Sequence, residues 1–203
     1  MDNSQPRLHV VGDSISMGYG PDLARMLDGV ARYSRKPQTG DDPESANGRD
    51  SGSVLAYLVG LRAAERVDID YLMVNCGLHD IKRNLDDGQL LTALDQYVDN
   101  LRTITWYARE GTHTLVWVRT TPVADAIHNS YPDIPFRRFA SDVATYNAAA
   151  DAVMLEADAY VIDLFSFTRS LGPDVYCDHV HFTPEVARLQ AAFIAGNLSQ
   201  IIT

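Results

Sequence analysis

A serine near the start of the chain and an aspartate and histidine near its end are the three residue types of a nucleophilic relay: Ser14, Asp178 and His181. A serine hydroxyl is a weak nucleophile near neutral pH because it holds its proton. A histidine can accept that proton, and a carboxylate on the other ring nitrogen fixes the tautomer and stabilises the imidazolium. Asp178 and His181 are three residues apart, so one turn or tight loop can present both on the same side. The chemistry that this set could perform is attack on a carbonyl carbon.

The residues around Ser14 predict that it lies where a strand ends. Residues 8–11 form a short apolar run typical of a buried strand. Residues 17–21 look like a turn, with Pro21 suited to the first position of a helix. In an open α/β sheet, ligands bind at the carboxyl ends of the strands. The alternative is that Gly12, Asp13 and Ser14 form a turn without chemistry.

The whole chain alternates between strand and helix patterns, which predicts an α/β domain with a doubly wound parallel sheet. We expect one domain over residues 1–203, with no internal repeat. The segments that open on one edge of such a sheet carry Ser14, Gly48 to Gly52, Gly77 to Asp80, and Asp178 with His181. The expected strands are 8–11, 30–34, 70–76, 113–118 and 160–162; the expected helices are 21–28, 51–66 capped by Ser51, 89–109, 137–157 and a last one from Pro184 capped by Thr183; the long loops are 35–50 and 120–135.

Composition excludes several classes of partner. The net charge of −10 argues against nucleic acid and against an anionic bilayer, because both attract basic surfaces. No run of 18 apolar residues could span a membrane, and the first six residues lack the basic and apolar segments of a leader. Cys76 and Cys177 are expected to be free thiols in a reducing compartment. We therefore expect a cytoplasmic protein that acts on a small molecule without a cofactor; the oligomeric state stays open.

Four short motifs, taken in order, resemble the blocks of the SGNH hydrolases, also called the GDSL esterase family. They are Gly12-Asp13-Ser14-Ile15, a glycine block assigned to Gly52, Gly77-Leu78-His79-Asp80, and Asp178-His179-Val180-His181. Each match alone is weak, but four in the family's order span nearly the whole chain. The resemblance implies a three-layer α/β/α, flavodoxin-like fold with a five-stranded parallel sheet.

The resemblance also implies a role for each matched residue. Ser14 is the nucleophile, His181 the base, and Asp178 the residue that orients His181. The backbone N–H groups of Ser14 and Gly52 are donors to the oxyanion. No metal is expected.

His79 departs from the family pattern, which has an asparagine side chain as the third oxyanion donor. A neutral imidazole carries one N–H and can still donate, provided that a neighbour sets its tautomer; a protonated one would make the contribution depend on pH. Two alternatives remain. His79 packs under its loop and leaves two donors, or Asn75, earlier in the strand, replaces it.

Several other residues have plainer interpretations beside functional ones. His179 with Asp178 and His181 suggests zinc, but further ligands at a recognised spacing are missing. Asp13 is expected to brace the turn, and Cys177 to be structural. Five residues in or beside loops are candidates either for a substrate pocket or for loop packing: Tyr19, His128, Tyr131, Phe136 and Arg137.

The leading hypothesis for function is a serine hydrolase that cleaves a carboxylic ester through an acyl-enzyme on Ser14. A short acyl or acetyl group fits, and an acetylated sugar is one candidate substrate because both long loops are polar. The alternatives are an acyltransferase of the same fold, in which an alcohol replaces water, and a non-catalytic binding module.

Overall fold

Five parallel strands form the central sheet of the computed structural model, which describes residues 5–64, 68–111 and 113–202. The strand order is β2-β1-β3-β5-β7, and every neighbouring pair is parallel. This doubly wound order confirms the predicted fold class. The strands are β1 (Arg7–Val11), β2 (Arg32–Arg35), β3 (Tyr71–Val74), β5 (Thr114–Val118) and β7 (Tyr160–Ile162).

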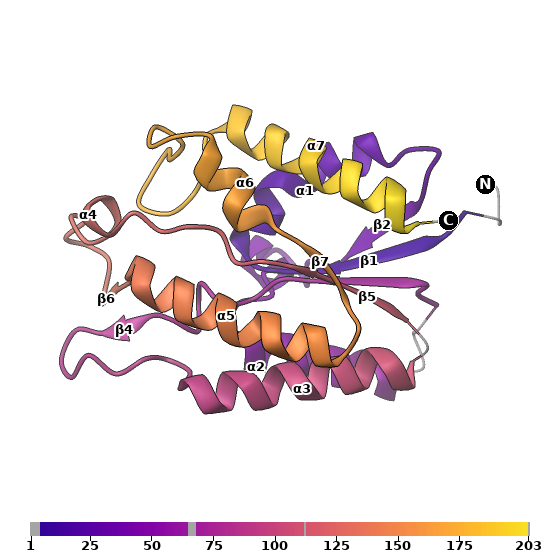
Figure 1. Ribbon diagram of the computed structural model, residues 1–203, viewed down its shortest axis with the longest axis horizontal. Coiled ribbons are helices and arrows are strands. Elements are labelled where there is room, and N and C mark those ends of the chain that lie inside the picture. Colours follow the sequence, from indigo (N-terminus) through magenta and orange to yellow (C-terminus); the bar gives the residue numbers. More distant parts are fainter. Residues whose placement is uncertain (1–4, 65–67, 112, 203) are drawn as a thin grey trace.

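Helices cover both faces of the sheet, which gives the three-layer arrangement seen in Figure 1. One face carries α1 (Ser14–Met26), α6 (Leu164–Ser170) and α7 (Pro184–Ile201). The other carries α2 (Ser51–Ala63), α3 (Leu94–Glu110) and α5 (Ala140–Glu156). The strands β1, β3 and β5 are almost wholly buried because helices cover them on both sides. The largest fully buried side chains are Tyr19, Tyr97, Trp117 and Tyr146.

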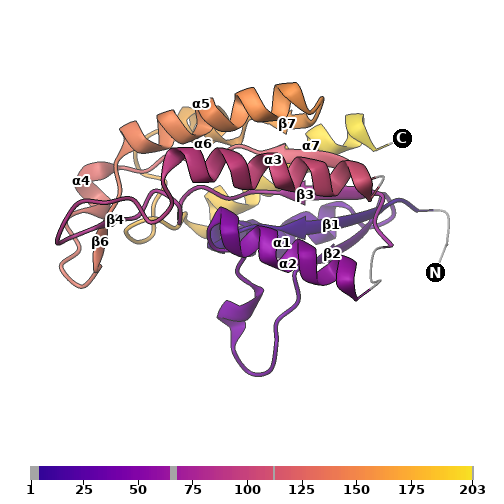
Figure 2. The ribbon, with the colours of Figure 1, turned by 90° about the horizontal axis from the view of Figure 1, so that it is seen from below.

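Smaller elements extend beyond the carboxyl edge of the sheet. An antiparallel ribbon pairs β4 (Arg83–Asn84) with β6 (Phe136–Arg137), and α4 (Asp125–His128) lies beside it (Figure 1). The segment between β2 and α2, which contains a short 3-10 turn (Pro43–Ala46), projects away from the sheet (Figure 2). These elements surround the edge on which the sequence predicts a site.

The structure corrects the predicted start of the first helix. The helix begins at Ser14, and Pro21 lies inside it rather than at its first position. The Asp13 side chain accepts a hydrogen bond from the Ile15 N–H and so caps the helix seven residues earlier than expected. Pro21 is exposed and has no backbone N–H, so one hydrogen bond of the helix is missing, but the helix continues past it.

Other boundaries also differ. Asp50, not Ser51, caps α2, and the predicted end of that helix at Arg66 lies outside the described residues. The helix predicted from residue 89 begins at Leu94, and the one predicted from residue 137 begins at Ala140 after β6. The segment after β7, predicted as a loop, contains α6 capped by Asp163. The N-cap Thr183 and the first helical residue Pro184 of α7 are confirmed.

No helix among the residues that the structure describes is long and apolar enough to cross a membrane.

Candidate active site

Ser14, His181 and Asp178 form one continuous chain of hydrogen bonds. The Ser14 Oγ lies 2.8 Å from the His181 Nε2, and the His181 Nδ1 lies 2.7 Å from the Asp178 Oδ2. A carboxylate only accepts, so Nδ1 carries the hydrogen and Nε2 is free to accept from the serine hydroxyl. These hydrogen bonds thus hold His181 in one tautomer, with its Nε2 directed at the Ser14 hydroxyl.

The Asp178 carboxylate also fixes the loop that carries it. Its Oδ1 accepts from the backbone N–H groups of Val180, at 2.8 Å, and His181, at 2.7 Å. Partial burial alone would raise the pKa of Asp178, but the hydrogen bonds from Val180 and His181 outweigh it and lower the pKa to about 2. Asp178 is therefore a carboxylate throughout the neutral range, as an acceptor for His181 must be.

The Ser14 hydroxyl lies at the N-terminus of helix α1. Ser14 is its first residue, so the Ser14 N–H has no carbonyl partner within the helix. The partial positive charge of a helix N-terminus favours negative charge there. Asp13 is 1% exposed and braces the turn through the Ile15 N–H, as expected from the sequence; burial raises its pKa. The N-terminus of α1 is suited to an oxyanion that forms beside Ser14.

His79 lies half-buried in the turn that follows β3. Burial, with the nearby charges of Lys82 and Arg138, lowers its pKa to about 3. The imidazole is therefore neutral at physiological pH and has one N–H to donate. Asn75, the alternative donor, is 7% exposed and its amide donates to the Val118 carbonyl at 2.8 Å, so this N–H is already used.

A buried carboxylate anchors the turn that carries His79. Both oxygens of Asp80 lie 3.0 Å from the Ser51 backbone N–H, and the Ser51 hydroxyl donates to Oδ1. Asn100 of α3 in turn donates to that hydroxyl at 2.9 Å. Burial raises the pKa of Asp80 to about 6 despite these bonds. The start of α2 and the His79 turn are therefore tied together.

The glycine that packs against the turn before Ser14 is Gly48. Its N–H donates to the Gly12 carbonyl at 2.8 Å, and a Cβ there would lie 2.9 Å from the same oxygen. Gly52, the glycine assigned from the sequence, lies in the first turn of α2, where an added Cβ would meet Asp50 and Asn100 instead. Gly48 was not predicted from the sequence, although it lies in the same segment 47–52 as Gly52, because its close approach to the backbone of Gly12 is seen only in the structure.

We expect Gly48→Ala to lower the free energy of unfolding by about 1–3 kcal/mol, because its Cβ would displace the backbone of Gly12. Gly60→Ala in α2 is the matched control, since nothing lies within 4 Å of its added Cβ. That change should stabilise the protein by about 0.5–1 kcal/mol. Chemical denaturation of both variants checks this, and equal stability of the two would contradict the close packing of Gly48.

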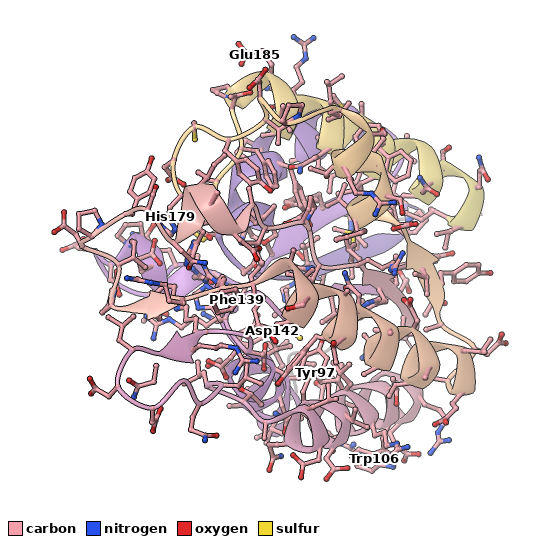
Figure 3. The ribbon with its side chains drawn as sticks, turned by 60° about the vertical axis from the view of Figure 1, so that its left-hand side comes forward. Tyr97, Trp106, Phe139, Asp142, His179 and Glu185 are labelled. Carbon is pink, nitrogen blue, oxygen red and sulfur yellow. The ribbon has the colours of Figure 1, made fainter. Side chains whose placement is uncertain are left out.

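A pair of histidines supports the loop between Asp178 and His181. The Nδ1 of His128, in α4, lies 3.3 Å from the His179 carbonyl and 2.9 Å from the His179 Nδ1. The carbonyl accepts, so His128 donates. Burial lowers the pKa of His128 to about 4, which keeps the pair uncharged near neutral pH. Figure 3 shows His179 beside α4 at this edge of the molecule.

The residues in or beside loops that the sequence offers as candidates for a substrate pocket are mostly packing residues. Tyr19 is 1% exposed within α1 and belongs to the core. Tyr131 packs its ring 5.7 Å from that of His179, and Phe136 lies 5.6 Å from His128. Arg137 belongs to β6. Tyr131 and Phe136 thus continue the ring cluster that reaches His181 through His179.

Within the described ranges, no group of three or more histidine, cysteine, aspartate or glutamate side chains could hold a metal ion. Cys76 and Cys177 are free thiols, the first buried and the second exposed. The Cys177 thiol lies 3.3 Å from the Phe182 carbonyl, which is consistent with a structural role.

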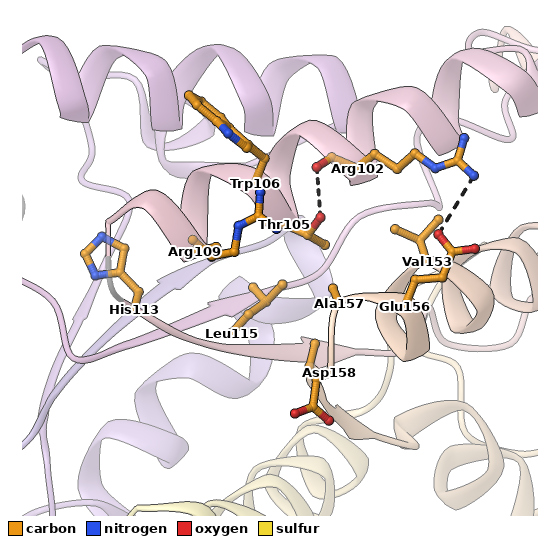
Figure 4. Close-up of a pocket in the computed structure, with 12 residues that line it drawn as sticks. Arg102, Thr105, Trp106, Arg109, His113, Leu115, Val153, Glu156, Ala157 and Asp158 are labelled. Atoms are coloured by element: carbon orange, nitrogen blue, oxygen red, sulfur yellow. Dashed lines mark hydrogen bonds and ion pairs between the residues drawn. The ribbon is translucent and has the colours of Figure 1, made fainter.

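A hollow lies between α3 and α5, away from Ser14, Asp178 and His181 (Figure 4). Its volume is about 390 Å³, and Trp106, Arg109, His113 and Glu156 are among the residues around it. None of the hydrogen-bonded residues Ser14, Asp178 and His181 lines it. The His113 ring is held by a hydrogen bond of 2.9 Å between its Nδ1 and the Ile69 carbonyl, and its Nε2 packs against Gly111.

The fold is that of the GDSL-like acylhydrolases. The GDSL-like lipase/acylhydrolase family matches residues 10–189, and the chain belongs to this family. A comparison with curated protein sequences finds no match.

Solved structures resemble the chain over almost its entire length. A lipase/acylhydrolase from Enterococcus faecalis has a TM-score of 0.71 at 16% identity, with 98% of each chain covered. The psychrotrophic esterase EstA from a Pseudoalteromonas species has a TM-score of 0.67 at 14% identity, covering 97% of this chain and 98% of its own. The acetyl xylan esterase AlAXEase has a TM-score of 0.69 at 14% identity, covering 97% and 100%. At these identities the likeness concerns the fold.

Proposed function

We propose that the protein is a carboxylic ester hydrolase that works through an acyl-enzyme on Ser14. The observation that carries the proposal is the hydrogen-bonded chain from the Ser14 Oγ through His181 to Asp178, with distances of 2.8 and 2.7 Å. Membership of a family of lipases and acylhydrolases supports the same reaction class.

In the first half of the reaction, the His181 Nε2 takes the hydroxyl proton of Ser14 as Oγ attacks the ester carbonyl carbon. The resulting imidazolium is stabilised by the Asp178 carboxylate. The tetrahedral intermediate collapses, the bond to the alcohol oxygen breaks, and His181 returns the proton to that oxygen. In the second half, water loses a proton to His181 as it attacks the acyl carbon. The bond from this carbon to the Ser14 Oγ then breaks, His181 returns the proton to Oγ, and the acid is released.

Two donors are proposed for the oxyanion of the intermediate. One is the Ser14 N–H, at the positive end of α1. The other is the ring N–H of the neutral His79. The N–H of Gly52 stays a prediction from the family resemblance. Donors fixed before the reaction stabilise charge that develops only in the transition state.

Acetyl and other short acyl groups are the proposed acyl part of the substrate, and an acetylated sugar is one candidate. Support comes from a fold neighbour that is an acetyl xylan esterase. Product analysis with added alcohols separates hydrolysis from acyl transfer.

A fluorophosphonate and an activated ester test the proposal together. The wild type should hydrolyse 4-nitrophenyl acetate with a burst of nitrophenol, and the fluorophosphonate should label Ser14. Ser14→Ala should lose both the burst and the label while it keeps the wild-type circular dichroism spectrum. Labelling at another serine, or hydrolysis that survives in Ser14→Ala, would overturn the assignment.

A further inference from the structure

Basic side chains surround the His79 turn, although the chain as a whole has a net charge of −10. Lys82 follows His79 in the same turn, and its N–H donates to the His79 carbonyl at 3.2 Å. Arg138 approaches from the start of α5, and its Nε donates to the Leu78 carbonyl at 2.6 Å. Arg49 is exposed in the segment before α2. All three are close enough to His79 for their charges to lower its pKa.

Two of these cations lie against one aromatic ring. The Lys82 Nζ is 4.6 Å from the centre of the Phe136 ring, and the Arg138 guanidinium carbon is 4.8 Å from it. Arg83 anchors the ribbon that carries Lys82, through two hydrogen bonds of 2.8 and 2.7 Å to Asp142 at the start of α5. Asp142 is labelled next to Phe139 in Figure 3. The position of the ammonium group is therefore built by the fold.

The cations are not neutralised by ion pairs. Within the described part of the chain, no carboxylate lies within ion-pair distance of Lys82, Arg49 or Arg138. Arg138 is 3% exposed, and its Nη1 has no hydrogen-bond partner. Burial and the charges of Arg138 and Arg49 lower the pKa of Lys82 to about 8, although the carboxylates of Asp50 and Asp13 oppose this. Among the described residues, Lys82 therefore has no carboxylate as a direct partner.

Lys82 also lines a hollow of about 400 Å³ beside the ribbon. Its other walls include Asn84, Gln89, Leu90 and Phe136, and no carboxylate is among its described lining residues. The hollow therefore offers apolar walls, amide groups and a single ammonium group. An ester group at Ser14 and a charged group near Lys82 can belong to one substrate, because Lys82 and the proposed oxyanion donor His79 share one turn.

We propose that the substrate carries a carboxylate or a similar anionic group beside the ester and that Lys82 recognises it, while the nearby charges of Arg49 and Arg138 add to the attraction. This inference rests on the proposed function and names the substrate class of the same site. A partly buried hydrogen bond to a charged group discriminates more strongly than a neutral one.

Two pairs of esters that differ only in charge test the proposal and locate the charge. The acyl arm compares 4-nitrophenyl hydrogen succinate with its methyl ester. The alcohol arm compares 3-acetoxybenzoate with its methyl ester. Each kcat/KM is divided by the rate constant for hydroxide hydrolysis of the same ester, which corrects for intrinsic reactivity.

In one arm, the wild type should prefer the charged ester by roughly tenfold or more, the size expected of one charged contact. Lys82→Met should bring this ratio close to one, and Lys82→Arg should keep most of it. The matched control is Arg62→Met, which removes a cation stacked 5.2 Å from the centre of the Trp106 ring, outside the proposed site. It should leave the ratio unchanged. Added salt should reduce the preference.

A ratio of one or less in both arms, or a preference that survives in Lys82→Met, would overturn the inference while leaving the proposed function intact. The proposed function fails differently: none of the four esters is then cleaved and the fluorophosphonate does not label Ser14. In that case the charge recognition falls with it.

Discussion

His181→Ala is expected to lower kcat for an activated ester by roughly 10⁴- to 10⁶-fold, about as much as Ser14→Ala. Without the imidazole, nothing else among the described contacts of the Ser14 Oγ can accept its proton, since its hydrogen bond goes to the His181 Nε2. The folded structure should persist, because the His181 side chain is partly exposed. Stopped-flow measurement of the nitrophenol burst beside the melting temperature checks both statements.

The double variant of Ser14 and His181 is the sharper measurement. Residues that act as a unit contribute non-additively, so the double variant should be no slower than either single one. Multiplied losses in the double variant would mean that the serine and the histidine act independently. Asp178→Asn makes the third comparison: it exchanges an acceptor for an amide at 2.7 Å from Nδ1 and should cost up to about 10⁴-fold through the wrong tautomer.

The sequence predicts the fold and the approach of Asp178 to His181 because both depend on short-range patterns. Apolar runs alternate with amphipathic helices, and a doubly wound sheet brings the carboxyl ends of its strands to one edge. A spacing of three residues is compatible with two side chains on one side of a tight loop. The meeting of Ser14 with His181 across 167 positions then follows from the topology.

The start of α1, and which glycine packs against Gly12, depend on contacts in the folded protein that the local sequence does not show. Pro21 is a good first residue of a helix, yet the Asp13 cap lies nearer to the end of β1 and starts the helix there. Gly48 and Gly52 are equally plausible in sequence, and only the approach of Gly48 to the Gly12 carbonyl separates them. The helix start is a choice between two nearby signals of the same kind, and the assignment of Gly52 as an oxyanion donor stays a prediction.

The surroundings of His79 were also beyond prediction from the sequence. Arg138 donates to the Leu78 carbonyl, and the Lys82 ammonium lies over the Phe136 ring, although the residues of each pair are more than 50 positions apart. The net charge of the whole chain is −10, and this value does not predict the basic residues around His79. Long-range packing decides which of the few basic residues gather there.

His79→Ala tests the residue at which the chain departs from its family. If the ring N–H donates to the oxyanion, the variant should lose about 10²- to 10³-fold in kcat, roughly 2.7–4 kcal/mol, with little change in KM. His79→Asn supplies an amide N–H and should recover much of this loss. A packing role predicts instead that both variants melt at lower temperature and keep kcat within a few-fold.

The pH dependence gives an independent check on the same residue. Because the pKa of His79 is lowered to about 3, the folded protein holds a neutral imidazole at every pH above about 4. An unfolded histidine has a pKa near 6.5, so the folded state binds fewer protons between these values and loses stability as the pH falls from about 6.5 toward 3. His79→Asn should remove this part of the acid destabilisation. The fold reduction of kcat in His79→Ala should therefore be the same at pH 6 and pH 8. A reduction that grows toward low pH would mean that a protonated His79 is the donor, and normal turnover in a destabilised His79→Ala protein would exclude donation altogether.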